Sequence, residues 1–161
     1  MENIDFILPE IFISIGIMFL LIVGVFKKNS SHLIYSMSIL FLLITLGLLI
    51  NFPFEMETYL FNNSYKIDPL STFMKIVTIL SGIFVLVSSY KYVKLENIFN
   101  IEYPVLILSS ILGMLVMISS YDLIVFYIGL ELQSLALYVL AAFNREKTKS
   151  SEAGLKYFVL S

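Results

Sequence analysis

Residues 121–143, YDLIVFYIGLELQSLALYVLAAF, form an apolar run long enough for a membrane-spanning helix, with one carboxylate inside it. A span needs about 20 mainly apolar residues to cross a hydrocarbon core of roughly 30 Å. At about 1.5 Å per residue, Glu131 lies roughly 13 Å from Asp122 and 18 Å from Phe143, near the middle of the membrane. Because an unpaired carboxylate is costly there, we expect Glu131 to be neutral, paired with a cation, or turned to water inside a bundle.

Similar apolar runs fill the rest of the chain. Of its 161 residues, 59% are hydrophobic and 14% are charged, against roughly 25% charged residues in soluble domains. Five such runs in series argue against a soluble helical protein. We predict an all-α, polytopic transmembrane helix bundle in which residues 1–161 are a single transmembrane region. Its helices are expected at approximately 9–26, 33–51, 69–90, 104–120, 123–143 and 151–161, the last one incomplete.

The starts of two helices carry recognisable signals. Glu10, directly after Pro9, suits the positive end of a helix dipole, which explains an acid at this position. Asp68 and Pro69 form a cap followed by a proline at the first helical position. The polar stretch between residues 55 and 68 is long enough only for a structured loop.

The basic residues predict an orientation with the amino terminus outside. If the six helices alternate, Lys66 alone lies in a loop on the outer side. By the positive-inside rule, the other side faces the cytoplasm or the mitochondrial matrix. The acidic start and the lack of a small-residue cleavage site indicate a retained span and not a signal peptide. The basic residues of the inner side are Lys27, Lys28, Lys91, Lys94, Arg145, Lys147 and Lys149.

The chain lacks the usual ligands of redox centres. It has no cysteine and one histidine, His32, in a basic loop. Iron–sulfur, haem and zinc sites depend on these residue types, so we expect no cofactor and no metal in this chain. It also has no Gly-rich dinucleotide loop, so NADH chemistry would occur in a partner. We expect no nucleic-acid partner.

Two lysines accompany Glu131 inside the apolar runs. Lys156 lies roughly 9 Å from the inner end of its helix; it either extends to the inner surface or takes part in a water-linked relay with Glu131. Lys75 lies roughly 10 Å from the outer end of its helix, at a depth similar to that of Glu131. It either pairs with Glu131, which would make it a third proton-translocation residue beside Glu131 and Lys156, or extends outward to water. For Glu131 itself, the alternative to proton transport is a protonated carboxyl that only makes an interhelical hydrogen bond.

Small and hydroxylated residues recur in the helices expected at 104–120 and 123–143. Such residues allow helices to pack closely in lipid, which indicates that these helices have protein neighbours. They are Ser109, Ser110, Gly113, Gly129, Ser134 and Ala136.

Motifs at four places resemble one family. Residues 121–143, with the core GLELQSL, resemble the fifth helix of subunit 2 of NADH:ubiquinone oxidoreductase, respiratory complex I, which is called subunit N in bacteria. SSEAGLKYF at residues 150–158 is similar to the start of that subunit's sixth helix. Leu8-Pro9-Glu10 and the IDPLS stretch at residues 67–71 also fit. Related cation/proton antiporter subunits share the helix pattern, and the amino-terminal match favours subunit 2.

The resemblance implies the first five to six helices of an antiporter-like, proton-translocating membrane-arm subunit. Glu131 matches the family's helix-five glutamate and Lys156 its helix-six lysine. It also implies an enzyme complex, an H⁺-translocating NADH:ubiquinone reductase, whose FMN, iron–sulfur clusters and ubiquinone lie elsewhere. The implied partners are the other membrane-arm subunits and membrane lipids. There are two alternatives. The chain is a structural scaffold without its own proton path, or it is a subunit of a cation/proton antiporter complex.

The chain departs from the family in length. The family's core has two inverted repeats, and this chain stops within the first, before the helix whose lysine pairs with the glutamate. Either the gene is split and a second chain supplies the remaining helices, or this chain is a truncated piece of a longer one; we expect the split gene. The Phe, Ile, Tyr, Asn and Lys richness favours the mitochondrial inner membrane, with a bacterial inner membrane as the alternative.

Overall fold

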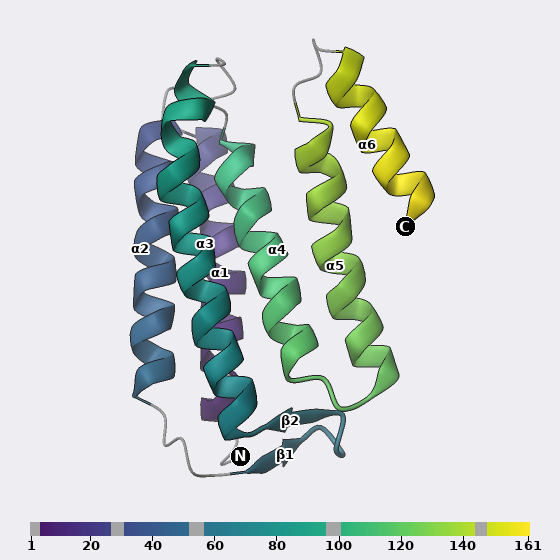
Figure 1. The fold of residues 1–161 in the computed structure, drawn as a ribbon. Coiled ribbons are helices and arrows are strands. Elements are labelled where there is room, and N and C mark those ends of the chain that lie inside the picture. The colour runs from purple at the N-terminus through teal and green to yellow at the C-terminus, as the bar shows by residue number, and fades with distance from the viewer. Residues whose placement is uncertain (1–3, 27–30, 52–56, 96–100, 144–147) are drawn as a thin grey trace.

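The computed structural model describes residues 4–26, 31–51, 57–95, 101–143 and 148–161. In these ranges the chain forms a polytopic helix bundle with one small hairpin, which confirms the predicted fold class (Figure 1). A short 3₁₀ turn, η1 (Ile4–Ile7), precedes the first helix. The helices are α1 (Leu8–Phe26), α2 (Ser31–Ile50), α3 (Pro69–Leu95), α4 (Glu102–Ile118), α5 (Leu123–Ala141) and α6 (Thr148–Leu160).

Four helices, α1, α2, α3 and α5, are long and apolar enough to cross a membrane. The helix α4 is also apolar but has 17 residues, slightly fewer than a full span. The helix α3 continues to Leu95, beyond the end expected at Tyr90. Lys91 and Lys94 lie in this extension, where the negative end of the helix dipole favours cations.

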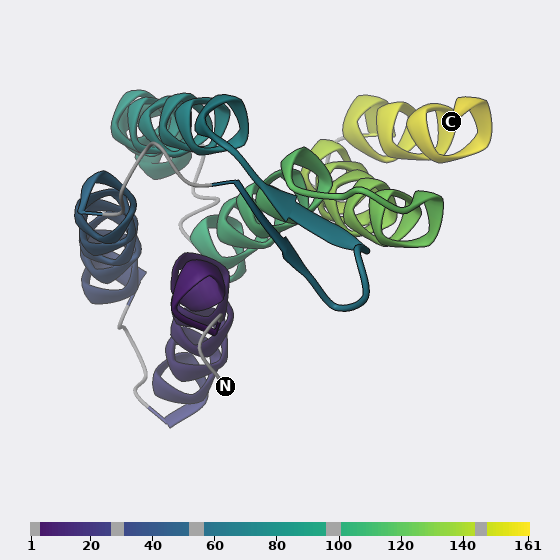
Figure 2. The same ribbon diagram turned by 90° about the horizontal axis from the view of Figure 1, so that it is seen from below.

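The helix α4 occupies the centre of the bundle, and Figure 2 shows α1, α3 and α5 around it. Large aliphatic side chains from the first four helices form one continuous core. Because lipid tails are as apolar as these side chains, the core stabilises a membrane bundle through close van der Waals packing. The fully buried members include Ile13, Leu20, Ile34, Leu42, Ile79, Leu86, Leu108 and Leu115.

Part of the polar stretch expected as a loop forms a two-stranded antiparallel hairpin. Its strands are β1 (Thr58–Leu60) and β2 (Tyr65–Ile67). The turn between them places Phe61, Asn62 and Asn63 at positive φ, a conformation that asparagine adopts more readily than most residues. The hairpin formed because its strands find backbone partners on the helix bundle as well as on each other.

The hairpin lies across one end of the bundle, which we call the hairpin end (Figure 2). The Lys66 N–H donates to the Ser119 carbonyl at 2.8 Å, and the Tyr121 N–H donates to the Ser64 carbonyl at 2.9 Å. These bonds attach the hairpin to the turn that joins α4 to α5. The helices α1, α3 and α5 all begin at this end.

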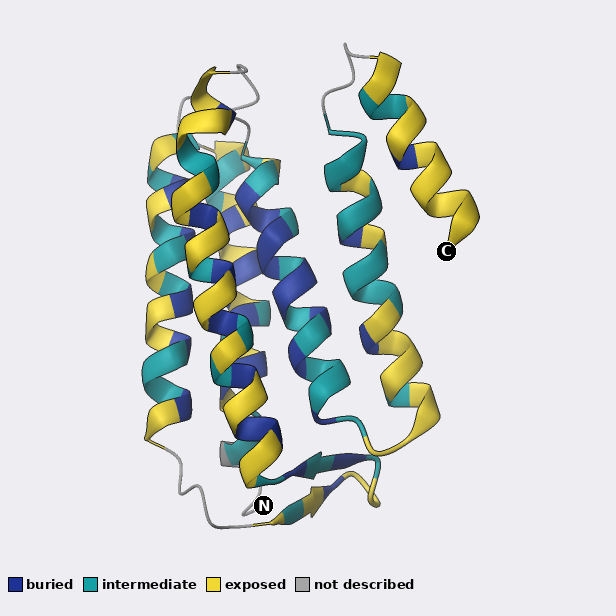
Figure 3. Ribbon diagram, viewed as in Figure 1, coloured by how far each residue is buried: buried dark blue, intermediate teal, exposed yellow. Residues whose placement is uncertain are grey.

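Burial is uneven across the molecule (Figure 3). On α5 only Gly129 and Ala136 are buried, and on α6 only Gly154 is. Both helices therefore present wide apolar faces that the described residues do not cover. Lys27, Lys28, Arg145 and Lys147, on which part of the orientation argument rests, lie outside the described residues, so the external amino terminus stays a prediction.

Candidate proton-binding sites

Glu131 lies near the middle of α5 and is half-buried. Gly129 and Gln133, two residues before and after it, pack against α4. Successive helical residues differ by about 100° in direction, so Glu131 lies on nearly the opposite side of α5 from that contact. Within the described ranges its side chain has no hydrogen bond and no ion pair. Glu131 thus lies on the side of α5 that faces away from α4.

Glycines bring α4 and α5 unusually close together. A Cβ atom added to Gly113 would lie 2.7 Å from the Gln133 backbone nitrogen and 2.8 Å from the Gly129 carbonyl oxygen. Only a residue without a side chain permits this approach of two backbones, as the small residues predicted. The contact fixes the rotation of α5 and hence the direction in which Glu131 points.

The helix α6 packs on the same side of α5 as Glu131. The Tyr138 ring meets the Tyr157 ring edge-on, with centroids 4.7 Å apart, and the Tyr138 hydroxyl bonds to Ser161. Tyr138 lies seven residues after Glu131, which is about two turns, so the two side chains share one face of α5. The Ser150 hydroxyl donates to the Ala141 carbonyl at 2.8 Å and holds the other end of α6.

Lys156 forms an ion pair with Glu152, one turn earlier on α6, at 2.7 Å. Both side chains are about two-thirds exposed, at 67% and 62%. The described structure does not bring Lys156 and Glu131 into contact, which agrees with the difference in depth inferred from the sequence. Whether a water-linked relay joins them stays a prediction.

Lys75 does not pair with Glu131, and it does not reach water. Its side chain is 2% exposed, and its Nζ lies 2.5 Å from Oε1 of Glu10 on α1. Both alternatives derived from the sequence were therefore wrong. The flexible lysine stem does extend towards the near end of the bundle, as snorkelling predicts, but the carboxylate of another helix meets it there. The helix dipole alone also does not explain Glu10, whose side chain is 6% exposed.

Tyr65 is the third member of this cluster, and its sequence position did not predict this role. Its hydroxyl donates to Glu10 Oε1 at 2.7 Å and lies 3.4 Å from Lys75 Nζ. Burial, together with the neighbouring Glu10 charge, raises the pKa of Tyr65 far above its ordinary value. The hydroxyl therefore stays protonated and acts as a fixed donor. We call Glu10, Lys75 and Tyr65 the buried triad; a tyrosine in a polar stretch gave no signal of this role.

One polar atom of the triad is buried without a hydrogen-bond partner among the described residues. It is Oε2 of Glu10, the carboxylate oxygen that neither Lys75 nor Tyr65 contacts. Ser119, on the α4–α5 turn, lies beside the Tyr65 hydroxyl on the other side of the triad. Buried polar atoms are rarely left unpaired, so Oε2 marks a place where a proton or a water molecule fits.

The other charges at the hairpin end pair among themselves. Lys66 Nζ lies 3.4 Å from Asp68 and 3.7 Å from Glu57. Desolvation acts to raise the pKa of Asp68, but hydrogen bonds from Ser71 and the Lys66 charge outweigh it and lower that pKa below its ordinary value. Asp68 is thus ionised at neutral pH, and neither ion pair of Lys66 includes a member of the buried triad.

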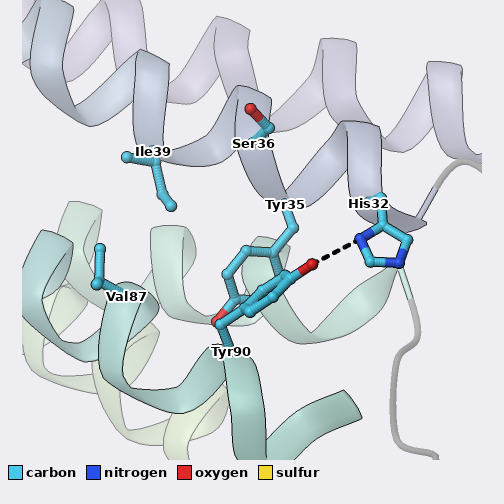
Figure 4. Close-up of a pocket in the computed structure, with 6 residues that line it drawn as sticks. All are labelled: His32, Tyr35, Ser36, Ile39, Val87 and Tyr90. Atoms are coloured by element: carbon cyan, nitrogen blue, oxygen red, sulfur yellow. Dashed lines mark hydrogen bonds between the residues drawn. The ribbon is translucent and has the colours of Figure 1, made fainter.

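A groove of about 450 Å³ lies between α2 and α3, close to the ends opposite the hairpin (Figure 4). His32 and Tyr90 meet across it through a 2.8 Å hydrogen bond. The Tyr35 hydroxyl donates to the Leu86 carbonyl at 2.6 Å and further ties the two helices together. Ser36, Ile39 and Val87 complete a mainly apolar lining.

The described ranges contain no group of three or more metal-ligating side chains. The expectation that redox cofactors lie in other subunits therefore still rests on the sequence.

Comparison with known proteins identifies relatives over the whole chain. The family described as NADH:quinone oxidoreductase/Mrp antiporter, transmembrane region, matches residues 120–161, which include Glu131 and Lys156. NADH-quinone oxidoreductase subunit N of Pelagibacter ubique is 66% identical over 161 residues, covering 100% of this chain and 34% of the relative. The subunit N proteins of Bartonella bacilliformis and Parvibaculum lavamentivorans are 45% and 42% identical, covering 96% and 95% of this chain and 31% and 32% of the relatives.

These relatives are bacterial, so the mitochondrial origin expected from composition finds no support, and the bacterial alternative is favoured. The chain spans about one third of their length. The resemblance inferred from the motifs around Glu10, Asp68, Glu131 and Lys156 is confirmed. Over its whole length, the chain is similar to these bacterial NADH-quinone oxidoreductase subunit N proteins, of which it spans about one third.

Proposed function

We propose that this chain forms the first part of an antiporter-like, proton-translocating subunit of a bacterial NADH:quinone oxidoreductase, with Glu131 as the residue that binds the transported proton. The observation that carries the proposal is the position of Glu131. It lies at mid-helix in an apolar span, on the face of α5 turned away from α4, without an ion partner in the described ranges. Ionisable residues at such depth mark ion and proton paths more often than they stabilise helices.

The chemistry requires only that the surroundings of Glu131 change. A cation brought near the carboxylate stabilises its charged form and releases the proton, and withdrawing the cation favours the protonated form. The lysine that pairs with it would come from a later helix, while Lys156 would continue the relay. Conformational changes begun at quinone reduction would alter the pairing, and other subunits would hold FMN, the iron–sulfur clusters and the quinone.

The exposed faces of α5 and α6 are the proposed docking surface for the helices that complete the subunit. The relatives are about three times as long as this chain, and most residues of α5 and α6 are not buried by the described residues. A second chain that supplies these helices remains a prediction. Other membrane-arm subunits and membrane lipids are the further proposed partners, and the groove lined by Tyr35, Ile39 and Val87 suits an acyl chain.

Replacing Glu131 by glutamine tests the proposal. Glutamine keeps the shape and hydrogen-bonding ability but cannot ionise. We expect the Glu131→Gln complex to assemble and the number of protons moved per NADH oxidised to fall several-fold in inverted membrane vesicles. Glu102→Gln is the matched control, because Glu102 is an exposed carboxylate in the first turn of α4. It should leave the proton ratio unchanged.

A scaffold role predicts a different outcome. If this chain only completes the membrane arm, a Glu131→Gln complex that assembles normally should pump as the unaltered complex does. That result would refute a proton path through Glu131 while leaving the membership in the complex intact.

A cation/proton antiporter subunit is the second candidate, because the matching family includes antiporter proteins as well as oxidoreductase subunits. Mass spectrometry of the complex that co-purifies from gently solubilised membranes separates the two. Flavin and iron–sulfur absorbance with oxidoreductase subunits supports the leading proposal. Antiporter subunits without these chromophores would overturn it. The same experiment identifies whether the later helices belong to a second polypeptide.

A further inference from the structure

The buried triad at the hairpin end contains a carboxylate that is better built to exchange a proton than to hold helices together. All three side chains are nearly inaccessible, with Glu10 at 5%, Lys75 at 1% and Tyr65 at 5% exposure of the whole residue. A buried ion pair loses so much hydration that well-packed apolar residues often stabilise a fold equally well or better. Since aliphatic packing and the Tyr35 and Tyr90 hydrogen bonds already join α1 and α3 to the bundle, stability alone gives a weak reason for two buried charges.

The two oxygens of Glu10 have different surroundings. Oε1 receives both the Lys75 ammonium at 2.5 Å and the Tyr65 hydroxyl at 2.7 Å. Oε2 is buried and has no partner among the described residues. A proton can therefore attach to Oε2 while both contacts at Oε1 persist, so that the carboxylate becomes a carboxylic acid without rearrangement of its neighbours.

We propose that Glu10 is a second proton-binding site of this chain, separate from Glu131, with Lys75 and Tyr65 holding Oε1 so that Oε2 binds and releases a proton. In the deprotonated state, the Lys75 ammonium balances the Glu10 carboxylate and the net charge of the pair is zero. Uptake of one proton from water converts the carboxylate to the acid and leaves a net charge of plus one on Lys75. A water molecule beside the unpaired Oε2 would deliver the proton.

Among the side chains that the structure describes, few charged groups lie near Glu10. Lys75 comes from α3 and Tyr65 from β2. Lys66, Asp68 and Glu57 lie at the same end but pair with one another. On α4 the described residues near this end are apolar or hydroxylated, and Asp122 at the start of α5 is exposed. The state of Glu10 therefore depends chiefly on Lys75 and the Tyr65 hydroxyl.

Infrared difference spectroscopy of the purified complex during pH titration tests the proposal. Acidification should produce a protonated-carboxyl band that shifts in heavy water and is lost in Glu10→Gln. Glu102→Gln, which removes an exposed carboxylate, should leave that band in place. In Lys75→Met, the uncompensated carboxylate should take up its proton at higher pH, so that the band is present already at neutral pH. A Glu10→Gln complex with an unchanged band pattern overturns the proposal.

A gentler variant keeps the test decisive if Glu10→Gln does not assemble. Tyr65→Phe deletes one hydroxyl and leaves both charges in place. Because it removes a donor to the carboxylate, it should move the midpoint of the band to higher pH. An unchanged midpoint in an assembled Tyr65→Phe complex would also overturn the proposal. This readout follows Glu10 directly, so its outcome is distinguishable from a failure of proton transport through Glu131.

Discussion

At the scale of single residues, Asp68 forms the helix cap that the sequence predicts, and the effect of this cap on stability can be measured. Its carboxylate accepts the Ser71 N–H at 2.7 Å, and its own N–H donates to the Ser71 hydroxyl at 2.9 Å. This reciprocal pair satisfies donors that the first turn of α3 would otherwise leave free. The predicted cap is thus present. Ser71 adds a second hydrogen bond to it, which was not predicted from the sequence.

The lowered pKa of Asp68 predicts a pH dependence of this cap. A folded-state pKa below the unfolded value contributes stability above the unfolded pKa, and that contribution is lost as the pH falls through the folded pKa. Hydrogen exchange at the amides of residues 70–73, corrected for intrinsic rates, should therefore become faster relative to the rest of α3 on acidification. Asp68→Asn should weaken this dependence, because asparagine caps a helix without titrating.

Removal of the cap gives a separate prediction. Asp68→Ala leaves the Ser71 N–H without its partner and should lower stability by about 0.5–2 kcal/mol. Thermal denaturation of the solubilised complex, compared with Asp68→Asn, measures it. Equal stability of the alanine and asparagine variants would show that the cap contributes nothing.

At the scale of elements, the closeness of α4 and α5 determines where Glu131 points. The small-residue pattern predicted that these helices have neighbours, and Gly113 and Gly129 are the residues at which the two backbones meet. The pattern could not say that the helices contact each other, because a stripe of small residues fits any partner helix. Their contact became apparent only in the folded arrangement.

Gly113→Ala should separate α4 from α5. The new methyl group would lie 2.7 Å from a backbone nitrogen of α5, and a backbone atom cannot move aside as a flexible side chain can. Overpacking of this kind typically costs about 1–3 kcal/mol. The expected results are a lower melting temperature of the solubilised complex and fewer protons moved per NADH oxidised. The second effect is expected because a displaced α5 carries Glu131 with it.

Gly47→Ala is the matched control within the same chain. Nothing lies within 4 Å of a Cβ atom at that position, which is also helical. Alanine favours helices over glycine, so this variant should be neutral or slightly more stable. If both variants behave alike, the close approach of α4 and α5 is not what limits stability.

At the scale of the whole molecule, the two ends of the bundle differ in charge and in construction. The hairpin end carries the buried triad and the paired charges of Lys66, Asp68 and Glu57. Among the described residues, Lys91, Lys94 and Lys149 lie at the other end. An excess of lysine on one side is what retains that side in the cytoplasm.

Cysteine labelling in intact cells tests this orientation, and the chain suits it because it contains no cysteine of its own. A membrane-impermeant maleimide should label Asn62→Cys, at the exposed tip of the hairpin, from outside the inner membrane. Lys94→Cys should react only after the membrane is permeabilised. The reverse pattern would overturn the predicted external amino terminus.

The sequence by itself determined the membrane class, the six helices, the depth of Glu131 and the family to which it is similar. These properties follow from runs of neighbouring residues, because a helix in lipid satisfies its hydrogen bonds within its own segment. Only the tertiary structure decided the partner of Lys75. Glu10 is 65 positions away along the chain, and Tyr65 comes from a hairpin that no apolar period predicts. Which helices become neighbours depends on packing between distant segments. The hydropathy pattern within one segment therefore does not identify the helices that pack against it.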